Sequence, residues 1–330
     1  MSTTSTPPSK LLLQGATRLQ HPYPPARQLT ASIVRLDRNS GMDLAGRALD
    51  WILDHLPEFD PYPDDGEIDI LRAKAAAELA LMCVACLRVP QLASDQRLSR
   101  FVEAMSEVIR RPIYNERIVG NPGEFRLIGG TYAALRACGL EDVGHHLATE
   151  RVPYRMLDLR YILELGGFRH DIPSYSELYA ATPLAAELKV AFIGVPEAYS
   201  ITHSIFFMTR FGAGPPNSIP DDDLPRVRWL VAMLLGIYSR ERHWDLVGEL
   251  LTCCHFLDWY PPLIFDEGWM AFWASQRLDG AVPGPHFSEE RLEGLGKPEQ
   301  PAYLFKHLYH TTLVAAMVGS LTVPTAKAKR

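Results

Sequence analysis

The chain has 330 residues, 47% of them hydrophobic, and its 33 Lys and Arg against 39 Asp and Glu give a formal net charge of −6. This is the composition of a globular protein with one large or two medium-sized domains. A nucleic-acid partner is not expected, because the chain has no basic block and phosphate binding requires clustered Lys and Arg.

The first residues differ in composition from the rest. Residues 1–10 read MSTTSTPPSK, which is small, polar and proline-containing, without the continuous apolar core of a secretory signal. We expect them to form a disordered tail. Many later connections contain proline, but none is long enough to act as an independent linker, so residues 11–330 are predicted to form a single all-helical domain.

Neither a membrane span nor disulfide bonds are expected. The longest apolar stretch, residues 311–323, contains Gly319 and Ser320 and falls short of the about 20 residues that cross a bilayer. Five cysteines are an odd number, and the adjacent Cys253 and Cys254 point in different directions on a helix. Reduced thiols and a cytoplasmic location are the simplest interpretation.

Apolar residues recur with helical spacing along most of the chain. In residues 94–111, for example, Leu98, Phe101 and Met105 belong to one apolar stripe, which Pro112 ends. About eleven helices are predicted in this way. The clearest cover residues 41–56, 67–88, 94–111, 127–138, 153–165, 196–211, 221–240, 244–256, 266–278 and 301–321.

Only residues 190–195 (VAFIGV) resemble a strand, and six apolar residues cannot be told from a buried helical turn by period alone. We therefore predict an all-α fold of helical hairpins, either α/α-toroid-like or a short α-solenoid. The sequence Gln276-Arg-Leu-Asp279-Gly280 resembles the turn found repeatedly in α/α-toroid enzymes such as terpenoid cyclases and protein prenyltransferases.

Linear motifs for metals and cofactors are missing. Cys83 and Cys86 have knuckle spacing but lie in the middle of an alanine-rich helix, which favours core packing. The Asp221-Asp222-Asp223 run precedes Pro225, so it is expected to begin a helix rather than hold Mg²⁺. No His-Glu-x-x-His string, glycine-rich phosphate loop or nucleophile elbow occurs. We predict that the protein uses no metal and no cofactor.

Residues 196–211 combine polar groups on one helical face. Tyr199, His203 and Arg210 share this face with Phe206, at i, i+4, i+7 and i+11 from Tyr199. A phenol, a base that titrates near neutral pH and a guanidinium that can hold an anion are thus expected side by side. The alternative is that buried helices carry His and Tyr with no functional role.

A second such face lies in residues 301–321. Tyr303, His307, His310 and Val314 share it, with Thr311 at its border. If both faces point inward, a histidine-lined cavity results.

Other candidates lie outside these two helices. Asp171 follows His170 in a predicted loop, after the Gly166-Gly167 pair that is expected to end a helix. Reactive groups are often found in such loops.

The candidate catalytic residues are His203, His310, Asp171 and Tyr199. The candidate substrate-binding residues are Arg210, Thr202, Glu197, His307, Thr311 and Trp269. Trp269 belongs to an aromatic stretch that either packs in the core or forms a pocket wall.

Three segments resemble an all-helical actinobacterial family of unassigned function, whose members occur among natural-product biosynthesis genes. They are residues 199–207 (YSITHSIFF), 276–280 (QRLDG) and 309–314 (YHTTLV). The family pattern has an acidic residue where this chain has Arg210, within Thr209-Arg210-Phe211-Gly212. This departure would fit an anionic substrate.

The predicted function is that of a cofactor-independent biosynthetic enzyme, a lyase or cyclase of the kind used in antibiotic biosynthesis. Elimination or intramolecular ring closure, including an aziridine-type displacement of a sulfate or phosphate leaving group, can proceed with positioned bases and an anion clamp. The expected partner is a small, anionic substrate, and no oligomeric state is predicted. One alternative is a non-enzymatic helical scaffold that binds a peptide or carrier protein; another is a terpene cyclase with unusual motifs.

Overall fold

The computed structural model describes residues 38–63, 67–111, 113, 125–138, 153–214 and 219–322. All of them belong to one unit of the chain, Leu36–Arg330. The predicted tail, residues 1–10, lies outside the described residues.

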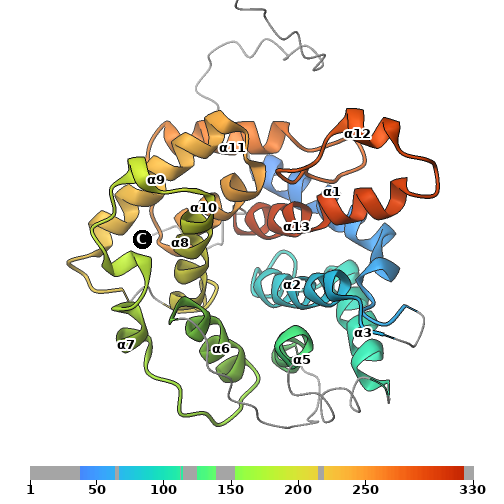
Figure 1. The fold of residues 1–330 in the computed structure, drawn as a ribbon, viewed down its shortest axis with the longest axis horizontal. Helices are drawn as coiled ribbons and strands as arrows, with labels where there is room; N and C mark the ends of the chain where they lie inside the picture. Colours follow the sequence, from blue (N-terminus) through green and yellow to red (C-terminus); the bar gives the residue numbers. More distant parts are fainter. Residues whose placement is uncertain are drawn as a thin grey trace, which may run out of the picture. The chain divides into compact units, whose positions relative to one another are not determined.

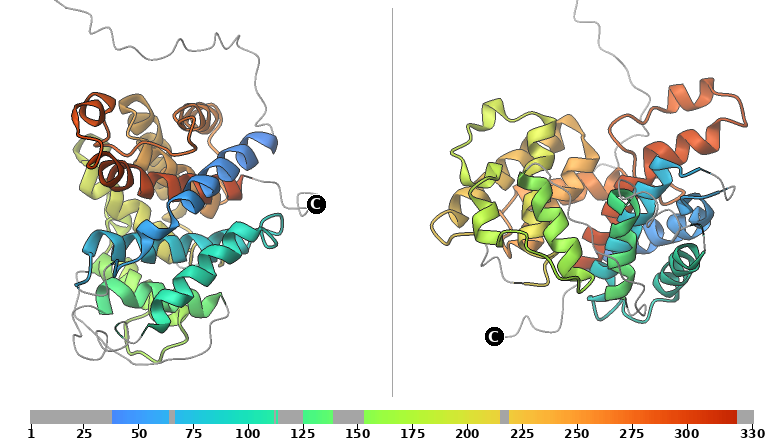
Figure 2. Two further views of the ribbon diagram at one scale, coloured as in Figure 1. Left: turned by 90° about the vertical axis from the view of Figure 1, so that its right-hand side faces the viewer. Right: turned by 60° about the horizontal axis from the view of Figure 1, so that its bottom comes forward.

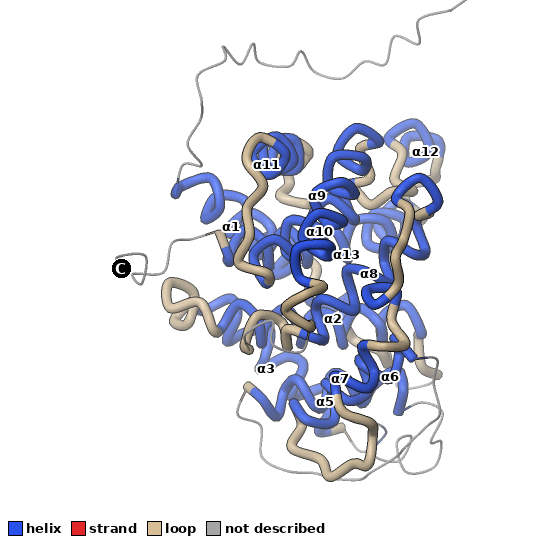
Figure 3. The backbone as a smooth tube through the Cα atoms, turned by 90° about the vertical axis from the view of Figure 1, so that its left-hand side faces the viewer, coloured by secondary structure: helices blue, strands red, loops and turns tan. Residues whose placement is uncertain are grey.

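The described part of the chain consists of helices and loops without a strand (Figure 3). This confirms the all-α prediction. The α-helices are α1 (Arg38–Asp54), α2 (Ile70–Leu87), α3 (Gln96–Arg110), α5 (Phe125–Ala137), α6 (Pro153–Leu165), α7 (Tyr175–Tyr179), α8 (Val195–Met208), α9 (Leu224–Glu241), α10 (Trp244–Phe256), α11 (Ile264–Ala274), α12 (Glu289–Gly294) and α13 (Gln300–Leu321). Three 3₁₀ turns lie at Leu56–Phe59, Pro183–Ala185 and Val190–Phe192.

Local capping explains where several helices begin. The side chain of Asp69 accepts hydrogen bonds from the backbone N–H groups of Leu71 and Arg72, at 2.8 and 3.1 Å, and so begins α2. At the start of α8, Pro196 lies in the first turn and Glu197 accepts a hydrogen bond from the Gly194 N–H at 3.0 Å. The N-terminal ends of α2 and α8 are therefore fixed by these caps.

Two segments differ from the sequence-based expectation. The helix predicted over residues 266–278 ends at Ala274, and Gln276 instead joins a turn in which its Nε2 donates to the carbonyl oxygens of Leu44 and Gly280, at 3.0 and 2.9 Å. Gly280 has a φ of +93°, which favours glycine. The strand-like residues 190–195 begin as a 3₁₀ turn, and Phe192 is 82% exposed, so this segment is not a buried strand.

Six helices pack in a closed cycle that follows chain order. α2 packs on α5, α5 on α6, α6 on α8, α8 on α10, α10 on α13, and α13 on α2 again (Figure 1). Four more helices pack outside this cycle: α1 on α13, α3 on α2, and α9 and α11 on α10. The toroid-like or solenoid arrangement stays a prediction, but the cycle brings helices from both halves of the described chain to one interior.

α13 is the central helix of this arrangement, with α1, α2 and α10 around it. Figure 2 shows α1 (blue) alongside the C-terminal part of α13 (red). Their backbones approach closely at Gly41 and Gly319, where a Cβ added to Gly41 would lie 2.9 Å from the Gly319 carbonyl oxygen. Glycine at this crossing lets the two helices pack without an intervening side chain.

The cysteines of α2 lie in the core, as predicted. Cys83 and Cys86 are free thiols with exposed fractions of 1% and 0%. Among the described residues, no helix combines the length and hydrophobicity that crossing a membrane requires.

Candidate functional site

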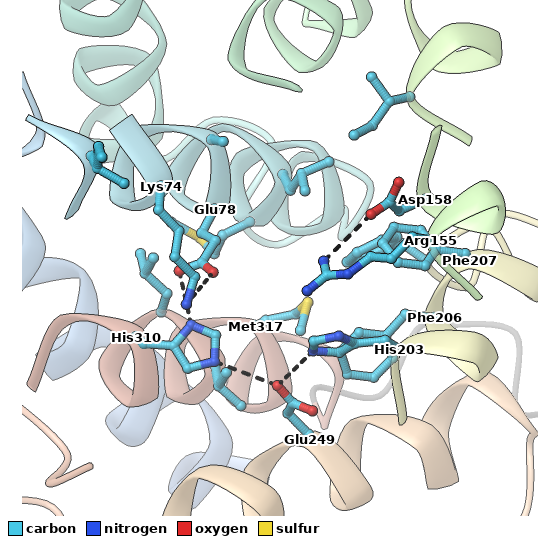
Figure 4. Close-up of a pocket in the computed structure, with 18 residues that line it drawn as sticks. Lys74, Glu78, Arg155, Asp158, His203, Phe206, Phe207, Glu249, His310 and Met317 are labelled. Carbon is cyan, nitrogen blue, oxygen red and sulfur yellow. Dashed lines mark hydrogen bonds and ion pairs between the residues drawn. The ribbon is translucent and has the colours of Figure 1, made fainter. Parts of the chain in front are cut away.

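A cavity of about 670 Å³ opens inside the cycle of helices, lined by α2, α6, α8, α10, α13 and Phe211 (Figure 4). His203 of α8 and His310 of α13 both line it. The structure thus brings together the two histidines that helical spacing had placed on separate inward-facing surfaces.

The cavity wall has an apolar part and a charged part. Phe206, Phe207 and Phe211 form an aromatic surface at the C-terminal end of α8. Lys74 of α2 and Arg155 of α6 also line the cavity, with side chains that are 60% and 53% exposed. Each of these cations lies 3.5 Å from a carboxylate that also lines the cavity, Lys74 from Glu78 and Arg155 from Asp158. The cavity can therefore hold a molecule with an apolar body and a polar group.

The two histidines meet at one buried carboxylate. His203 Nε2 lies 3.3 Å from Glu249 Oε1, and His310 Nε2 lies 3.4 Å from the same oxygen. The side chain of Glu249 is only 1% exposed, whereas those of His203 and His310 are 31% and 27% exposed. The carboxylate is thus covered by two imidazoles that themselves reach the cavity.

His310 is surrounded by three carboxylates. Its Nδ1 lies 2.9 Å from Glu78 Oε2 of α2, while its Nε2 lies 3.4 Å from both Asp245 Oδ1 and Glu249 Oε1 of α10. Asp245 and Glu249 are four residues apart on α10 and therefore share a face of that helix. Two helices, α2 and α10, thus supply the carboxylates around one imidazole of α13.

A second layer of hydroxyl groups holds these carboxylates. Tyr199 donates a hydrogen bond to Asp245 Oδ2 at 2.5 Å, and Thr311 donates to Asp245 Oδ1 at 3.0 Å. Thr202 donates to Glu249 Oε2 at 2.5 Å. Thr202 and Thr311 are buried and do not line the cavity. They fix the carboxylates in place from behind the cavity wall.

The charges of the cluster stabilise one another. Burial alone would raise the pKa of Glu78, but the charge of His310 and its hydrogen bond outweigh burial and hold that pKa at about 2. Burial would likewise raise the pKa of Glu249, yet the neighbouring His203 and His310 lower it. For His310, burial opposes the charged form, but Asp245 and Glu78 raise its pKa well above the usual value. At neutral pH Glu78 and Glu249 are therefore carboxylates beside the imidazolium of His310.

Arg210 does not reach the cavity. The expectation that it shares a face with Tyr199 and His203 required α8 to continue through residue 211, but α8 ends at Met208. Arg210 has a φ of +51°, so the chain leaves the helical path there and its exposed side chain lies against Gly214. Lys74 and Arg155 line the cavity, whereas Arg210 does not.

Four other candidates also lie away from the cavity lining. Glu197 is exposed and accepts the hydrogen bond that begins α8, and Asp171 is exposed in the loop between α6 and α7. The His307 ring packs against the Tyr303 ring at an interplanar angle of 51°, with centroids 4.4 Å apart. Trp269 is buried in α11, where its Nε1 donates to Ser40 Oγ at 3.3 Å, so the core-packing alternative holds for this residue.

Sequence reasoning missed the carboxylates of the site. Glu78 lies in an alanine-rich helix, and Glu249 lies between Gly248 and Leu250 in a helix whose residues are almost all buried. An isolated acidic residue within an apolar helix is the signal that could have found them, because a buried charge is costly unless it is paired.

One donor set in the cluster is suited to a metal ion. Asp245, Glu249 and His310 each offer a ligand atom, and these atoms lie within 4.8 Å of one another. The sequence contained no linear motif for this set, because its members come from two helices, α10 and α13. The prediction of a protein without metal or cofactor stays a prediction.

The fold and the site define an all-α protein with a buried ionisable cluster that opens on a cavity. The family described as "Domain of unknown function (DUF6895)" matches residues 45–320, and the chain belongs to this family. The match includes Glu78, His203, Asp245, Glu249 and His310. No similar protein was found among the curated proteins or the solved structures.

Proposed function

We propose that this chain is an enzyme that removes a proton from a small molecule bound in the helical cavity, as a lyase or cyclase. The observation that carries the proposal is the pair of imidazoles, His203 and His310, on the two sides of Glu249 Oε1 at 3.3 and 3.4 Å. Ionisable groups that perturb one another in a cavity are typical of catalytic sites.

His203 is the proton acceptor in this proposal. Its ring lines the cavity and contacts one carboxylate, whereas His310 is held as a cation among Glu78, Asp245 and Glu249. Glu249 accepts a hydrogen bond from the Nε2–H of His203 and stabilises the imidazolium that forms when the other ring nitrogen, Nδ1, accepts a proton, as the buried carboxylate does in other histidine–carboxylate pairs.

The reaction proposed is an elimination or an intramolecular ring closure. In the ring closure, a nitrogen of the substrate loses a proton to His203 and attacks a neighbouring carbon, and the carbon–oxygen bond to a sulfate or phosphate group breaks. The leaving group departs with the bonding electron pair. In this proposal Lys74 and Arg155, which line the cavity, bind the charge of the leaving group. The phenyl rings of Phe206 and Phe207 exclude water from the substrate's apolar part.

The biosynthetic setting of the reaction rests on the resemblance to the actinobacterial family found among natural-product genes. The alternative, a scaffold for a peptide or carrier protein, would leave His203 and His310 as separate packing residues. Their shared position on one cavity wall supports the enzyme over the scaffold.

The test is release of inorganic sulfate or phosphate from a panel of small amines that carry a sulfate or phosphate ester on the neighbouring carbon. We expect wild-type protein to release the anion and His203→Gln to be at least about 100-fold slower. His286→Gln, at an exposed histidine outside the cavity lining, is the control and should keep the wild-type rate. An unchanged rate in His203→Gln, or no release by the wild type across the panel, contradicts the proposal.

A further inference from the structure

The contacts of His310 Nε2 are unusual for hydrogen bonds. Its Nδ1 makes a hydrogen bond of ordinary length to Glu78, at 2.9 Å. Its Nε2, in contrast, lies 3.4 Å from Asp245 Oδ1 and 3.4 Å from Glu249 Oε1. N–H···O hydrogen bonds are about 2.7–3.2 Å long, so neither carboxylate is a close acceptor for this nitrogen.

The same distances match the edges of a tetrahedral metal site. Zn²⁺ binds imidazole nitrogen and carboxylate oxygen at about 2.0–2.1 Å, and two ligands of a tetrahedron with such bonds lie about 3.3–3.4 Å apart. The third pair of donors, on Asp245 and Glu249, also lies within 4.8 Å. One cation could therefore replace the Nε2 proton of His310, which is released to solvent, and contact all three ligand atoms with small adjustments of the side chains.

The groups behind these ligands form the outer layer that metal sites have. Glu78 accepts from His310 Nδ1, which orients the ring and leaves Nε2 directed at the other carboxylates. Tyr199 donates to the second oxygen of Asp245, and Thr202 donates to the second oxygen of Glu249. Each ligand is thus fixed by a hydrogen bond on its far side. The inner oxygens also have protein contacts, since Asp245 Oδ1 accepts from Thr311 at 3.0 Å and Glu249 Oε1 lies 3.3 Å from His203 Nε2. A carboxylate oxygen has two lone pairs, so each can still bind an ion.

We propose that Asp245, Glu249 and His310 bind a divalent transition-metal ion, with Glu78 as the carboxylate that orients His310. Three protein ligands leave a coordination position open, as in catalytic zinc sites. Glu249 and His310 line the cavity, so this position faces the substrate space. His203 stays outside the ligand set but contacts the same oxygen, Glu249 Oε1. The two proposals are therefore told apart by their measurements: ion binding tests the metal site, and the effect of His203→Gln on turnover tests the proton transfer.

The donor atoms narrow the choice of ion. One imidazole nitrogen and two carboxylate oxygens suit Zn²⁺ and its first-row neighbours, whereas Mg²⁺ prefers oxygen ligands at the shorter spacing of an octahedron. The described residues offer no thiolate in this set, which disfavours a soft ion such as Cu⁺.

Binding can be measured without knowledge of the substrate. Full-length protein, treated with a chelator and then desalted, is titrated with ZnCl₂ in a calorimeter, and with CoCl₂ in a spectrophotometer, because tetrahedral Co²⁺ absorbs visible light strongly. We expect one ion per chain and a visible Co²⁺ band. His310→Gln and Glu249→Gln should each weaken Zn²⁺ binding at least about 100-fold, and Glu78→Gln about 10- to 100-fold.

His307→Gln is the matched control, because His307 lies three residues before His310 on α13 but outside the cavity lining. It should bind Zn²⁺ like the wild type. The inference is overturned if the wild type takes up no stoichiometric ion, or if folded His310→Gln binds as tightly as the wild type, which would indicate surface histidines. Circular dichroism of each variant excludes unfolding as the cause of lost binding. Loss of the metal site with retained, His203-dependent turnover would leave the proposed function intact.

Discussion

His203 and His310 approach the same atom, Glu249 Oε1, from two helices that are distant in the sequence. The contact depends on the closed cycle of helices, in which α8 and α13 both pack on α10. Because Glu249 is almost fully buried, its charge is stabilised chiefly by these two rings and by Thr202. The site is therefore part of the protein's core as well as of its cavity, and changes in it should affect stability and function together.

The first prediction concerns the balance of charge in the core. His310→Ala removes the cation that faces Glu78, Asp245 and Glu249, and leaves three carboxylates close together without it. We expect the metal-free variant to lose about 3–5 kcal/mol in free energy of unfolding, the cost of breaking a buried ion pair from one side. Urea denaturation in the presence of a chelator measures it. His307→Ala, on the same helix, should lose about 1 kcal/mol or less, and equal losses in both variants would argue against a charge effect.

A second prediction tests the close approach of α10 and α13. A Cβ added to Gly248 would lie 2.6 Å from Val314 Cγ1 and 2.8 Å from Phe272 Cζ. Gly248→Ala should therefore destabilise the protein by about 1–3 kcal/mol through overpacking, despite the better helix propensity of alanine. The double variant with Val314→Ala relieves one of the two clashes and should show a favourable coupling of about 0.5 kcal/mol or more.

Gly236 in α9 provides the matched control, because a Cβ there would meet nothing within 4 Å. Gly236→Ala should stabilise the protein by about 0.5–1 kcal/mol. Thermal unfolding of the three variants separates packing from propensity. A loss of stability in Gly236→Ala similar to that in Gly248→Ala would mean that the helix crossing is not what requires glycine.

The sequence predicts the helices well because each depends on neighbours in the chain. The apolar stripe of residues 94–111 and the proline after it are local signals, and α3 forms there as Gln96–Arg110. The position of His203 on the inner face of α8 follows from the same spacing. Arg210 fails for an equally local reason, since two successive residues with positive φ, Arg210 and Phe211, carry the chain away from the helical axis.

The partners of the histidines could not be predicted in this way. Spacing shows that Asp245 and Glu249 share a face of α10, but not that this face meets α8 and α13. That juxtaposition comes from the packing of helices that are far apart in the sequence. No local sequence pattern indicates which helices pack together. The cationic groups of the cavity, Lys74 and Arg155, were missed because ordinary surface helices carry many such residues.

A pH-dependent loss of stability is expected from a histidine outside the site. Burial lowers the pKa of His255 from 6.5 to about 4. Its ring lies between Thr322 and Tyr260, at 3.1 Å from Thr322 Oγ1 and 3.2 Å from the Tyr260 hydroxyl. Because the folded protein takes up a proton less readily than the unfolded chain, the contribution of the neutral ring is complete above about pH 6.5 and declines as the pH falls toward 4.

The free energy of unfolding should fall by up to about 3 kcal/mol over this pH range because of His255, since one unit of pKa corresponds to about 1.36 kcal/mol. His255→Gln cannot take up the proton, so we expect its free energy of unfolding to fall less between pH 7 and pH 4 than that of the wild type. Urea denaturation at half-unit pH intervals measures the difference. His286→Gln, at an exposed position, should follow the wild-type curve. Parallel curves for His255→Gln and the wild type would show that His255 is not the group responsible.

The last prediction distinguishes Arg155 from Arg210 as the group that binds an anionic substrate. Arg155 lines the cavity and lies 3.5 Å from Asp158, while Arg210 is exposed and lies outside the lining. A charged hydrogen bond to a sulfate or phosphate is worth about 1.5–3 kcal/mol, so Arg155→Met should raise KM about 10- to 100-fold in the anion-release assay. Arg210→Met should leave KM unchanged, although the family resemblance had drawn attention to that position. The reverse result would mean that the anion binds at the end of α8, outside the cavity, and that the substrate does not lie against His203 in the orientation proposed.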